Sequence, residues 1–253
     1  MIEIDISRAI MHEYNRRVLE HLENDVVIVG GGPAGLAAGY YLAKTGVKTL
    51  ILEKRLSIGG GIWGGAAGCC VIALEDTEIT DEIGIPTKKQ KGLYLGDAIE
   101  FAAGLAIAAK KAGAEILNLM QAEDIIIKKK SVEGVVVNNT AIVAAGLHVD
   151  PYCISSKYLV DATGHAAEIV AILRKRNPQL FPKGVQEGFM DVEKSEAGVI
   201  KKTGEVYPGL FLAGMSVASV HNLPRMGPIF GGMLKSGKKA AEMICAKMQT
   251  AKP

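Results

Sequence analysis

The feature that most constrains the fold is a glycine-rich turn between a short apolar run and a helix. Residues 30–35 read GGGPAG, which places Gly30, Gly32 and Gly35 in the spacing G-x-G-x-x-G. The β-branched run at 25–30 predicts a buried strand, 33–46 a helix that ends at a glycine, and 47–54 a second buried strand. Such a unit pairs its strands in parallel. The chain is therefore expected to form an α/β fold around a parallel sheet.

The same turn predicts a dinucleotide site. Its glycines allow a tight turn, close approach of a pyrophosphate and close packing of helix on strand. Glu53 ends the second strand 18 residues after Gly35, where a carboxylate takes the ribose hydroxyls. A second glycine cluster at 57–68, which contains Gly61 and Trp63, is expected to wrap the same ligand. The alternatives are a structural glycine turn and a flexible surface loop.

The remaining pattern predicts one continuous domain over residues 1–253. An amphipathic helix at 5–22 carries Ile6, Ile10 and Tyr14 on one stripe, either to cover the core or to contact another subunit. The long glycine-rich segment 54–93 is expected to be functional or to hold small strands. The other predicted elements are a helix at 95–112, a strand at 115–120, an antiparallel meander over 123–144, strands at 157–164 and 209–214, and a closing helix at 228–248.

Composition excludes several classes of protein. With 49% hydrophobic and 22% charged residues the chain is globular, and a net charge of +2 gives no field for nucleic acid or an acidic membrane. The uncharged apolar run at 101–109 is far shorter than the about 18 residues that span a bilayer. Four cysteines without C-x-x-C spacing form neither a disulfide framework nor a zinc site. A reducing cytoplasm is therefore expected.

The first 70 residues leave the choice of dinucleotide open. Residues 25–70 resemble the amino-terminal part of the FAD/NAD-binding fold of flavoprotein disulfide reductases and amine oxidases, the glutathione-reductase type. In such flavoproteins a late strand runs into Gly-Asp, and the aspartate holds the flavin. Here the late strand GLFLAG is followed by Met215. The FAD reading thus lacks its second anchor, although an FAD-dependent oxidoreductase remains an alternative.

Further segments resemble one family, the thiazole synthases of thiamine biosynthesis. They are VVIVGGGPAGL, LEKRLSIGGGIWGGAAG, HVDPYC, DATGH and GLFLAGMSVASVHNLPRMGPIFGGMLKSG, and together they cover nearly the whole chain. The resemblance implies that NAD is a substrate: nicotinamide leaves, the ADP-ribose part condenses with glycine, and sulfur is inserted. The product would be an adenylated thiazole carboxylate, and it or a related intermediate would co-purify with the protein.

Members of the family that this chain resembles obtain sulfur from two different sources. Fungal and plant members sacrifice a cysteine two positions before Asp-Pro, and here that position holds His148, in the segment Leu147-His148-Val149-Asp150-Pro151. Histidine has no sulfur to give. The chain therefore resembles the archaeal members, which use external sulfide and turn over repeatedly.

Four polar residues are expected to carry the chemistry or to bind the substrate. Asp150 and His165 offer a carboxylate and an imidazole, a donor set that suits iron(II), although His165 is also compatible with a helix cap or a core position. The resemblance implies that both ligate iron and that His148, Asp150 and His165 are catalytic. Arg225 is expected to grip the carboxylate of glycine, since a guanidinium binds carboxylates bidentately, unless it is merely a solvated loop arginine.

The other expected contacts are to the nucleotide and to further subunits. The nucleotide-binding residues are expected to be Gly30, Gly32, Ala34, Gly35, Glu53, Lys54, Gly61, Ile125, His148 and Met215. The resemblance implies a homo-octamer whose sites are completed by neighbouring subunits. Two weaker alternatives are ribose 1,5-bisphosphate isomerase, for which the sequence offers no separate basic cluster, and a non-catalytic nucleotide-binding module.

Overall fold

The centre of the molecule is an eight-stranded mixed sheet. The computed structural model describes residues 1–250, so that the last three residues of the predicted domain, 251–253, lie outside the described residues. The strands of the sheet are β1 (Glu23–Val29), β2 (Thr49–Glu53), β6 (Glu115–Asn118), β7 (Met120–Lys128), β8 (Ser131–Asn139), β9 (Tyr152–Asp161), β11 (Gly204–Tyr207) and β12 (Leu210–Leu212). The order β6-β2-β1-β9-β12 is parallel, and β11 pairs antiparallel with β12.

The other elements surround this sheet. The helices are α1 (Ile2–Glu20), α2 (Pro33–Lys44), α3 (Glu78–Glu82), α4 (Ala98–Ala112), α5 (Thr140–Ala144), α6 (Glu168–Arg176), α7 (Val192–Lys202), α8 (Met215–Val220) and α9 (Gly231–Thr250), with 3-10 turns η1 (Ile62–Gly64), η2 (Gly164–Ala166) and η3 (Pro178–Leu180). The strands β3 (Val71–Leu74), β4 (Lys88–Gln90) and β5 (Leu93–Asp97) form a small antiparallel sheet, and β10 (Gly188–Met190) pairs with β13 (Pro224–Arg225). No helix among residues 1–250 has the length and apolar character that a membrane span requires.

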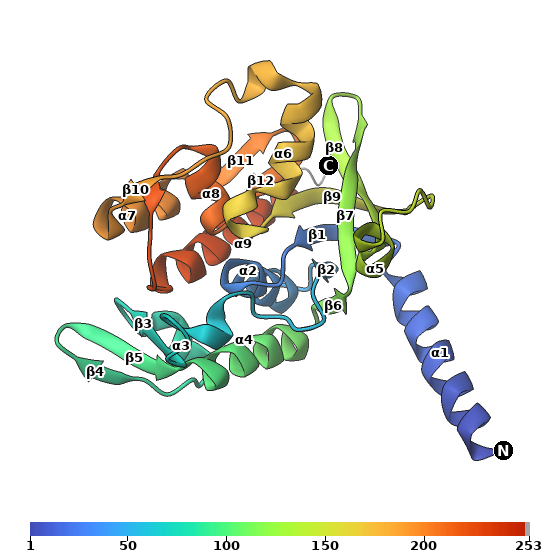
Figure 1. Ribbon diagram of the computed structural model, residues 1–253, viewed down its shortest axis with the longest axis horizontal. Coiled ribbons are helices and arrows are strands. Elements are labelled where there is room, and N and C mark those ends of the chain that lie inside the picture. The colour runs from blue at the N-terminus through green and yellow to red at the C-terminus, as the bar shows by residue number, and fades with distance from the viewer. Residues whose placement is uncertain (251–253) are drawn as a thin grey trace.

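Both faces of the sheet are covered, which explains the continuous apolar runs of its strands. Along β1, Val26 and Ile28 pack into a core shared with α2, α4 and α9, whereas Val27 and Val29 pack into a second core with the β7–β8 hairpin, α6 and α8. Figure 1 shows α2 and α4 on one side of the sheet and α6 and α8 on the other. The predicted α/β fold with a central parallel sheet is confirmed.

The first strand–helix–strand unit has the predicted order, with β1 and β2 adjacent and parallel. Helix α2 ends at Lys44 and Gly46 follows with φ +80°, in agreement with the expected glycine stop. The segment 54–93 does hold small strands. One of them, β3, lies within the apolar run CCVIAL at 69–74. The βαβ unit thus fixes the position of the glycine turn.

Two predicted elements were wrong in extent or type, and two helices were not predicted. Helix α4 begins at Ala98 rather than at 95, because 93–97 form β5 and the carboxylate of Asp97 accepts hydrogen bonds from the N–H groups of Ile99 and Glu100. Residues 140–144 are the helix α5 rather than a strand of a meander, with Asn139 as its cap. The sequence pattern also missed α6 and α7.

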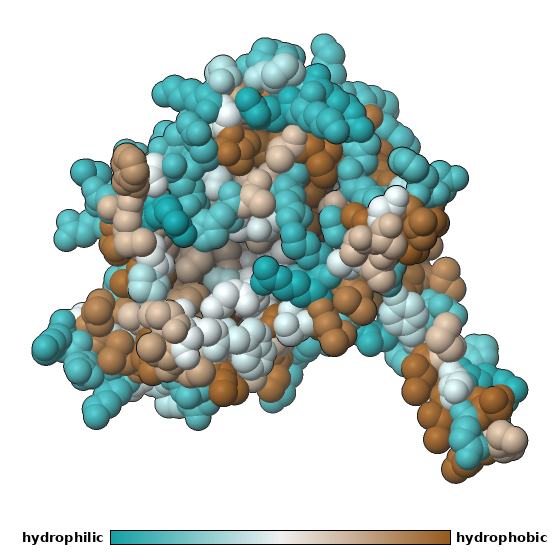
Figure 2. Space-filling view, viewed as in Figure 1, coloured by the Kyte–Doolittle hydropathy of each residue, from teal (hydrophilic) through white to brown (hydrophobic). Residues whose placement is uncertain are grey.

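The expectation that the first helix covers the core was wrong. Helix α1 starts at Ile2 and has no buried residue, and Ile6, Ile10 and Tyr14 are exposed. Figure 1 shows α1 extending away from the rest of the chain, and Figure 2 shows apolar side chains along it. Near its end, Arg17 pairs with the carboxylate of Glu115 at the start of β6.

Candidate functional site

The three glycines of the turn have different physical roles. Gly30 has φ +106°, and a Cβ there would lie 2.3 Å from the carbonyl oxygen of Ala162. A Cβ on Gly35 would lie 1.9 Å from the carbonyl oxygen of Gly30. Gly32 has no atom within 4 Å of its Cβ position and lines a cavity. Gly30 and Gly35 therefore permit close backbone packing, whereas Gly32 leaves space for a ligand.

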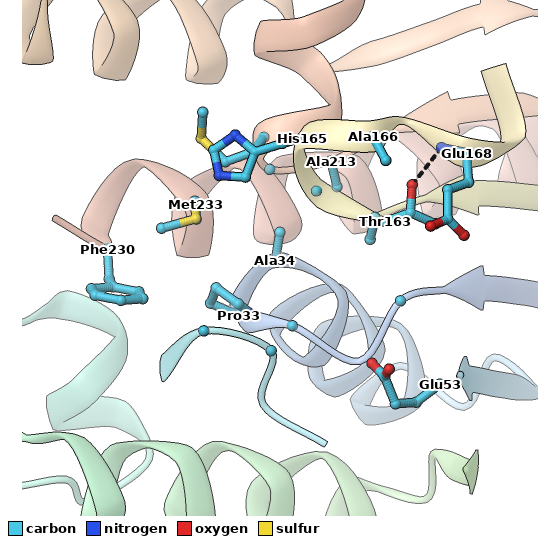
Figure 3. A pocket seen from close by; sticks show the side chains of 18 of the residues that line it. Pro33, Ala34, Glu53, Thr163, His165, Ala166, Glu168, Ala213, Phe230 and Met233 are labelled. Atoms are coloured by element: carbon cyan, nitrogen blue, oxygen red, sulfur yellow. Dashed lines mark hydrogen bonds between the residues drawn. The ribbon is translucent and has the colours of Figure 1, made fainter. Parts of the chain in front are cut away.

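The cavity has a volume of about 790 Å³ and lies at the carboxyl ends of β1, β2 and β9. That edge is where ligands of open α/β sheets bind. Figure 3 shows Glu53 at one end of the cavity, Pro33 and Ala34 of the turn in the middle, and His165, Met233 and Phe230 at the other end. The cavity is therefore elongated and has chemically distinct ends, as a dinucleotide requires.

At the first end, the carboxylate of Glu53 is buried and held by backbone. Its Oε2 accepts a hydrogen bond from Gly31 N at 2.9 Å, and its Oε1 accepts one from Arg55 N at 2.8 Å. The neighbouring Lys54 forms an ion pair with Glu168, and both side chains line the cavity. These contacts fix the carboxylate at the position where a ribose would lie.

The wall that carries His165 is fixed by a buried carboxylate. Asp161 ends β9, and its Oδ1 accepts hydrogen bonds from Thr163 N at 3.1 Å, Thr163 Oγ1 at 2.7 Å and Ser216 Oγ at 3.0 Å. Its Oδ2 accepts one from Val170 N at 3.1 Å. Burial raises the pKa of Asp161, and these hydrogen bonds oppose that rise. Asp161 thereby ties the η2 turn to α6 and α8.

At the other end, His165 and Arg225 meet at a carboxylate. The Nδ1 atom of His165 lies 2.7 Å from Oε1 of Glu187, and the Nε atom of Arg225 lies 3.6 Å from its Oε2. The side chain of Glu187 is only 9% exposed, whereas those of His165 and Arg225 are 60% and 58% exposed and line the cavity. The carboxylate of Glu187 thus contacts an imidazole and a guanidinium that both line the cavity.

Most of the residues predicted to bind the nucleotide line this one cavity. They are Gly30, Gly32, Ala34, Glu53, Lys54, Gly61 and Met215. Gly35 lies behind the turn, and Ile125 of β7 packs against the core beneath the hairpin instead of facing the cavity. Arg225, predicted to bind the glycine carboxylate, lines the same cavity as Met215.

His148 and Asp150 occupy a different place. Both lie on an exposed loop between α5 and β9, and neither lines the cavity. Figure 1 shows the chain between α5 and β9 projecting beyond the β7–β8 hairpin. Within residues 1–250, no three His, Cys, Asp or Glu side chains are arranged to hold a metal ion. The structure therefore does not bring Asp150 and His165 of one chain together.

Sequence reasoning missed Glu168 and Glu187. Glu168 faces the cavity and pairs with Lys54, and Glu187 contacts His165 and Arg225. Glu168 follows the DATGH segment by three residues and starts a helix, a position that draws an acidic side chain. Glu187 lies in a segment without periodic pattern, so no local signal marks it.

The comparisons with known proteins agree over nearly the whole chain. The model of the Thi4 family matches residues 7–230. The chain is 47% identical to the thiamine thiazole synthase of Pyrococcus horikoshii, across 98% of this chain and 99% of that protein. It is 48% identical to that of Thermococcus kodakarensis, with the same two shares. The crystal structure of Thermovibrio ammonificans THI4 superposes with a TM-score of 0.93 at 43% identity, over 98% of each chain.

Proposed function

This chain belongs to the Thi4 family, and we propose on that premise that it forms an adenylated thiazole carboxylate from NAD, glycine and sulfide, with iron(II), by multiple turnover. The observation that carries the proposal is the single cavity that joins the glycine turn and Glu53 to His165 and Arg225. Thiazole formation in thiamine biosynthesis is the activity for which the curated relatives are named. The flavin-dependent oxidoreductase and the isomerase are set aside, because neither accounts for this full-length similarity.

The binding of NAD follows from the two ends of the cavity. The carboxylate of Glu53 accepts hydrogen bonds from the ribose hydroxyls of the adenosine half, and the pyrophosphate lies over Gly32 at the N-terminus of α2. This orientation directs the nicotinamide riboside toward His165 and Arg225. The bond to nicotinamide then breaks at the end of the cavity that carries the polar side chains.

Arg225 holds glycine next to this reacting end. Its Nε side is turned to Glu187, so that its two terminal nitrogens are available to a substrate carboxylate. Bidentate binding orients the amino group of glycine toward the ribose carbon that nicotinamide leaves. Proximity of this kind lowers the barrier by replacing a bimolecular encounter with a positioned one.

Two side chains that lie in different parts of the structure offer donor atoms that fit iron(II). With Nδ1 at Glu187, His165 presents Nε2 to the cavity, and Asp150 offers carboxylate oxygen on its exposed loop. When bound, iron(II) supplies a centre that accepts sulfide and substrate side by side. In this proposal His165 would supply a nitrogen ligand and Asp150 an oxygen ligand to the iron.

The separation of these two ligands supports a site shared between subunits in a homo-octamer. The exposed loop of one copy carries His148 and Asp150 to the cavity of another, and the exposed apolar side of α1 lies in a contact between copies. A symmetric assembly repeats the same contact at every site. The four cysteines are free, which fits an enzyme that works in the reducing cytoplasm.

The test is anaerobic incubation of the purified protein with NAD, glycine, iron(II) and sulfide. We expect more than one adenylated thiazole per chain by mass spectrometry, and an intact protein mass that does not fall by the mass of hydrogen sulfide. Dehydroalanine at any of Cys69, Cys70, Cys153 or Cys245, formed in step with product, would establish single turnover instead. Absence of product, or product without iron(II) after chelation, would refute the proposed reaction.

A further inference from the structure

We propose that Glu187 is a positioning residue that holds His165 and Arg225 in a fixed relation, so that one carboxylate sets both the metal-binding nitrogen and the substrate-binding guanidinium. The inference rests on the proposed function, because it assigns tasks to His165 and Arg225. It adds a residue that acts through both of them and that itself does not line the cavity.

The contact with His165 decides which ring nitrogen faces the cavity. Oε1 of Glu187 lies 2.7 Å from Nδ1, and a carboxylate at this distance accepts the Nδ1 proton, so that Nε2 keeps its free lone pair. Ser219 holds the backbone of the same turn. Its Oγ donates a hydrogen bond to the carbonyl oxygen of His165 at 2.7 Å and lies 3.2 Å from Oε1 of Glu187. The imidazole is thereby held at its ring and at its backbone.

The contact with Arg225 uses the other oxygen. Oε2 of Glu187 lies 3.6 Å from Nε, which restrains the guanidinium without occupying its two terminal nitrogens. With its side chain only 9% exposed, Glu187 is shielded from competing water, whereas the two groups it contacts reach the cavity. The carboxylate accepts the Nδ1–H of His165 and lies beside the positively charged guanidinium of Arg225, which explains how the fold tolerates its low exposure.

Backbone hydrogen bonds keep Glu187 in register with Arg225. Gln186 N donates to the carbonyl oxygen of Ser219 at 3.0 Å, Gly188 N to that of Leu223 at 2.9 Å, and Asp191 N to that of Arg225 at 3.2 Å. Strands β10 and β13 are the paired part of this segment. Backbone hydrogen bonds before and after Glu187 therefore join its segment to the segment that carries Arg225, as positioning requires.

Two variants of Glu187 separate the two contacts. Glutamine retains an oxygen that accepts the Nδ1 proton of His165, but the amide that replaces Oε2 is a donor and faces the Arg225 donor. We expect Glu187→Gln to keep cobalt(II) affinity within about twofold, and to raise the KM for glycine by roughly fivefold, the size of a lost half-exposed ion pair. Glu187→Ala removes both contacts and should weaken cobalt(II) binding by about 10- to 100-fold.

The experiment uses the full-length assembled protein. Cobalt(II) binding is followed by its visible absorption, NAD binding by calorimetry, and glycine KM and kcat by product formation, with Glu193→Ala on the exposed start of α7 as the matched control. NAD affinity and thermal midpoint should stay unchanged in Glu187→Gln. Should the alanine variant fall in thermal stability, the glutamine variant still tests the split between metal affinity and glycine KM.

Unchanged cobalt(II) affinity and unchanged glycine KM in a folded Glu187→Ala, beside an active wild type, would overturn the positioning role while the proposed function stands. A parallel loss of cobalt(II), glycine and NAD binding in both variants would reduce Glu187 to a structural residue. An inactive wild type that binds cobalt(II) would instead refute the proposed function, so the two failures are distinct.

Discussion

The two parts of the molecule that were predicted to make one catalytic centre are built in opposite ways. The corner of His165, Glu187 and Arg225 is formed by η2, β13 and the segment before β10, and the side chain of its orienting carboxylate is only 9% exposed. The loop with His148 and Asp150 is exposed throughout and does not line the cavity at the glycine turn. In the proposed function, residues that are held by their own chain bind NAD and glycine. The residues on the exposed loop are proposed to complete the site of a second chain.

A mixture of two inactive variants is the most direct test of whether the two regions of one site come from different chains. Asp150→Ala and His165→Ala should each reduce thiazole formation by more than about 1,000-fold, because each removes a proposed metal ligand, while NAD binding stays within about threefold. If the ligands come from different subunits, refolding the two variants together should restore activity to about a quarter of the sites, since each site then has a one-in-four chance of two intact ligands.

The control for this mixture is each variant refolded with itself, which should stay inactive. A mixture that stays as inactive as the two controls would place both ligands in one chain, and the loop would then have to move to the cavity. Metal-independent activity in either single variant would remove the residue from the metal site altogether. Product is measured by mass spectrometry after anaerobic incubation with iron(II).

The second test asks whether the nucleotide half is complete within one chain. Gly32→Val places a side chain in the space that the pyrophosphate needs, and we expect NAD affinity to fall by about 100-fold, because donors at the helix N-terminus can no longer be reached. Gly64 also has open space around its Cβ position but does not line the cavity, so Gly64→Val is the matched control. Calorimetric titration with NAD measures both. Full NAD affinity in Gly32→Val would show that the pyrophosphate lies elsewhere.

The sequence predicted the part of the fold that local pattern determines. Glycine spacing, β-branched strands and Glu53 located the βαβ unit and one end of the cavity, because these signals lie within 30 contiguous residues. The sequence left two roles open for α1 and only core cover was wrong, because a periodic apolar stripe shows that a face is to be covered but not by what. Glu187 was missed because its two contacts are with residues 22 and 38 positions away.

The difference between the two regions should also appear in stability. Asp161→Ala leaves the N–H of Val170 and the groups on Thr163 and Ser216 without their acceptor, which should cost about 3 kcal/mol of unfolding free energy. Asp161→Asn keeps an oxygen at the Oδ1 position and should cost less. His148→Ala and Asp150→Ala should change stability by less than about 0.5 kcal/mol, because both side chains are exposed. Urea unfolding compares the four variants. Equal losses of unfolding free energy in the Asp161 variants and in the His148 and Asp150 variants would contradict this difference between the two regions.

The smallest expected effect concerns the pH dependence of the junction between α1 and the sheet. Burial pushes the pKa of Glu115 upward, but hydrogen bonds from Arg17, Lys110 and Ile116 N outweigh it and lower the pKa to about 2, from an ordinary 4.5. The unfolded chain therefore binds more protons than the folded chain between these two values, so that the stabilisation is complete above about pH 5 and is lost as the pH falls toward 2. Glu115→Gln should cost on the order of 1 kcal/mol at neutral pH, since Arg17 is partly exposed, and progressively less as the pH falls through about 2. Urea unfolding of both proteins across this range measures the difference. A cost that stays constant with pH would mean that packing, rather than the charge of Glu115, attaches the end of α1. The exposed remainder of α1 and the 147–151 loop would still be the segments that the proposed octamer assigns to contacts between copies.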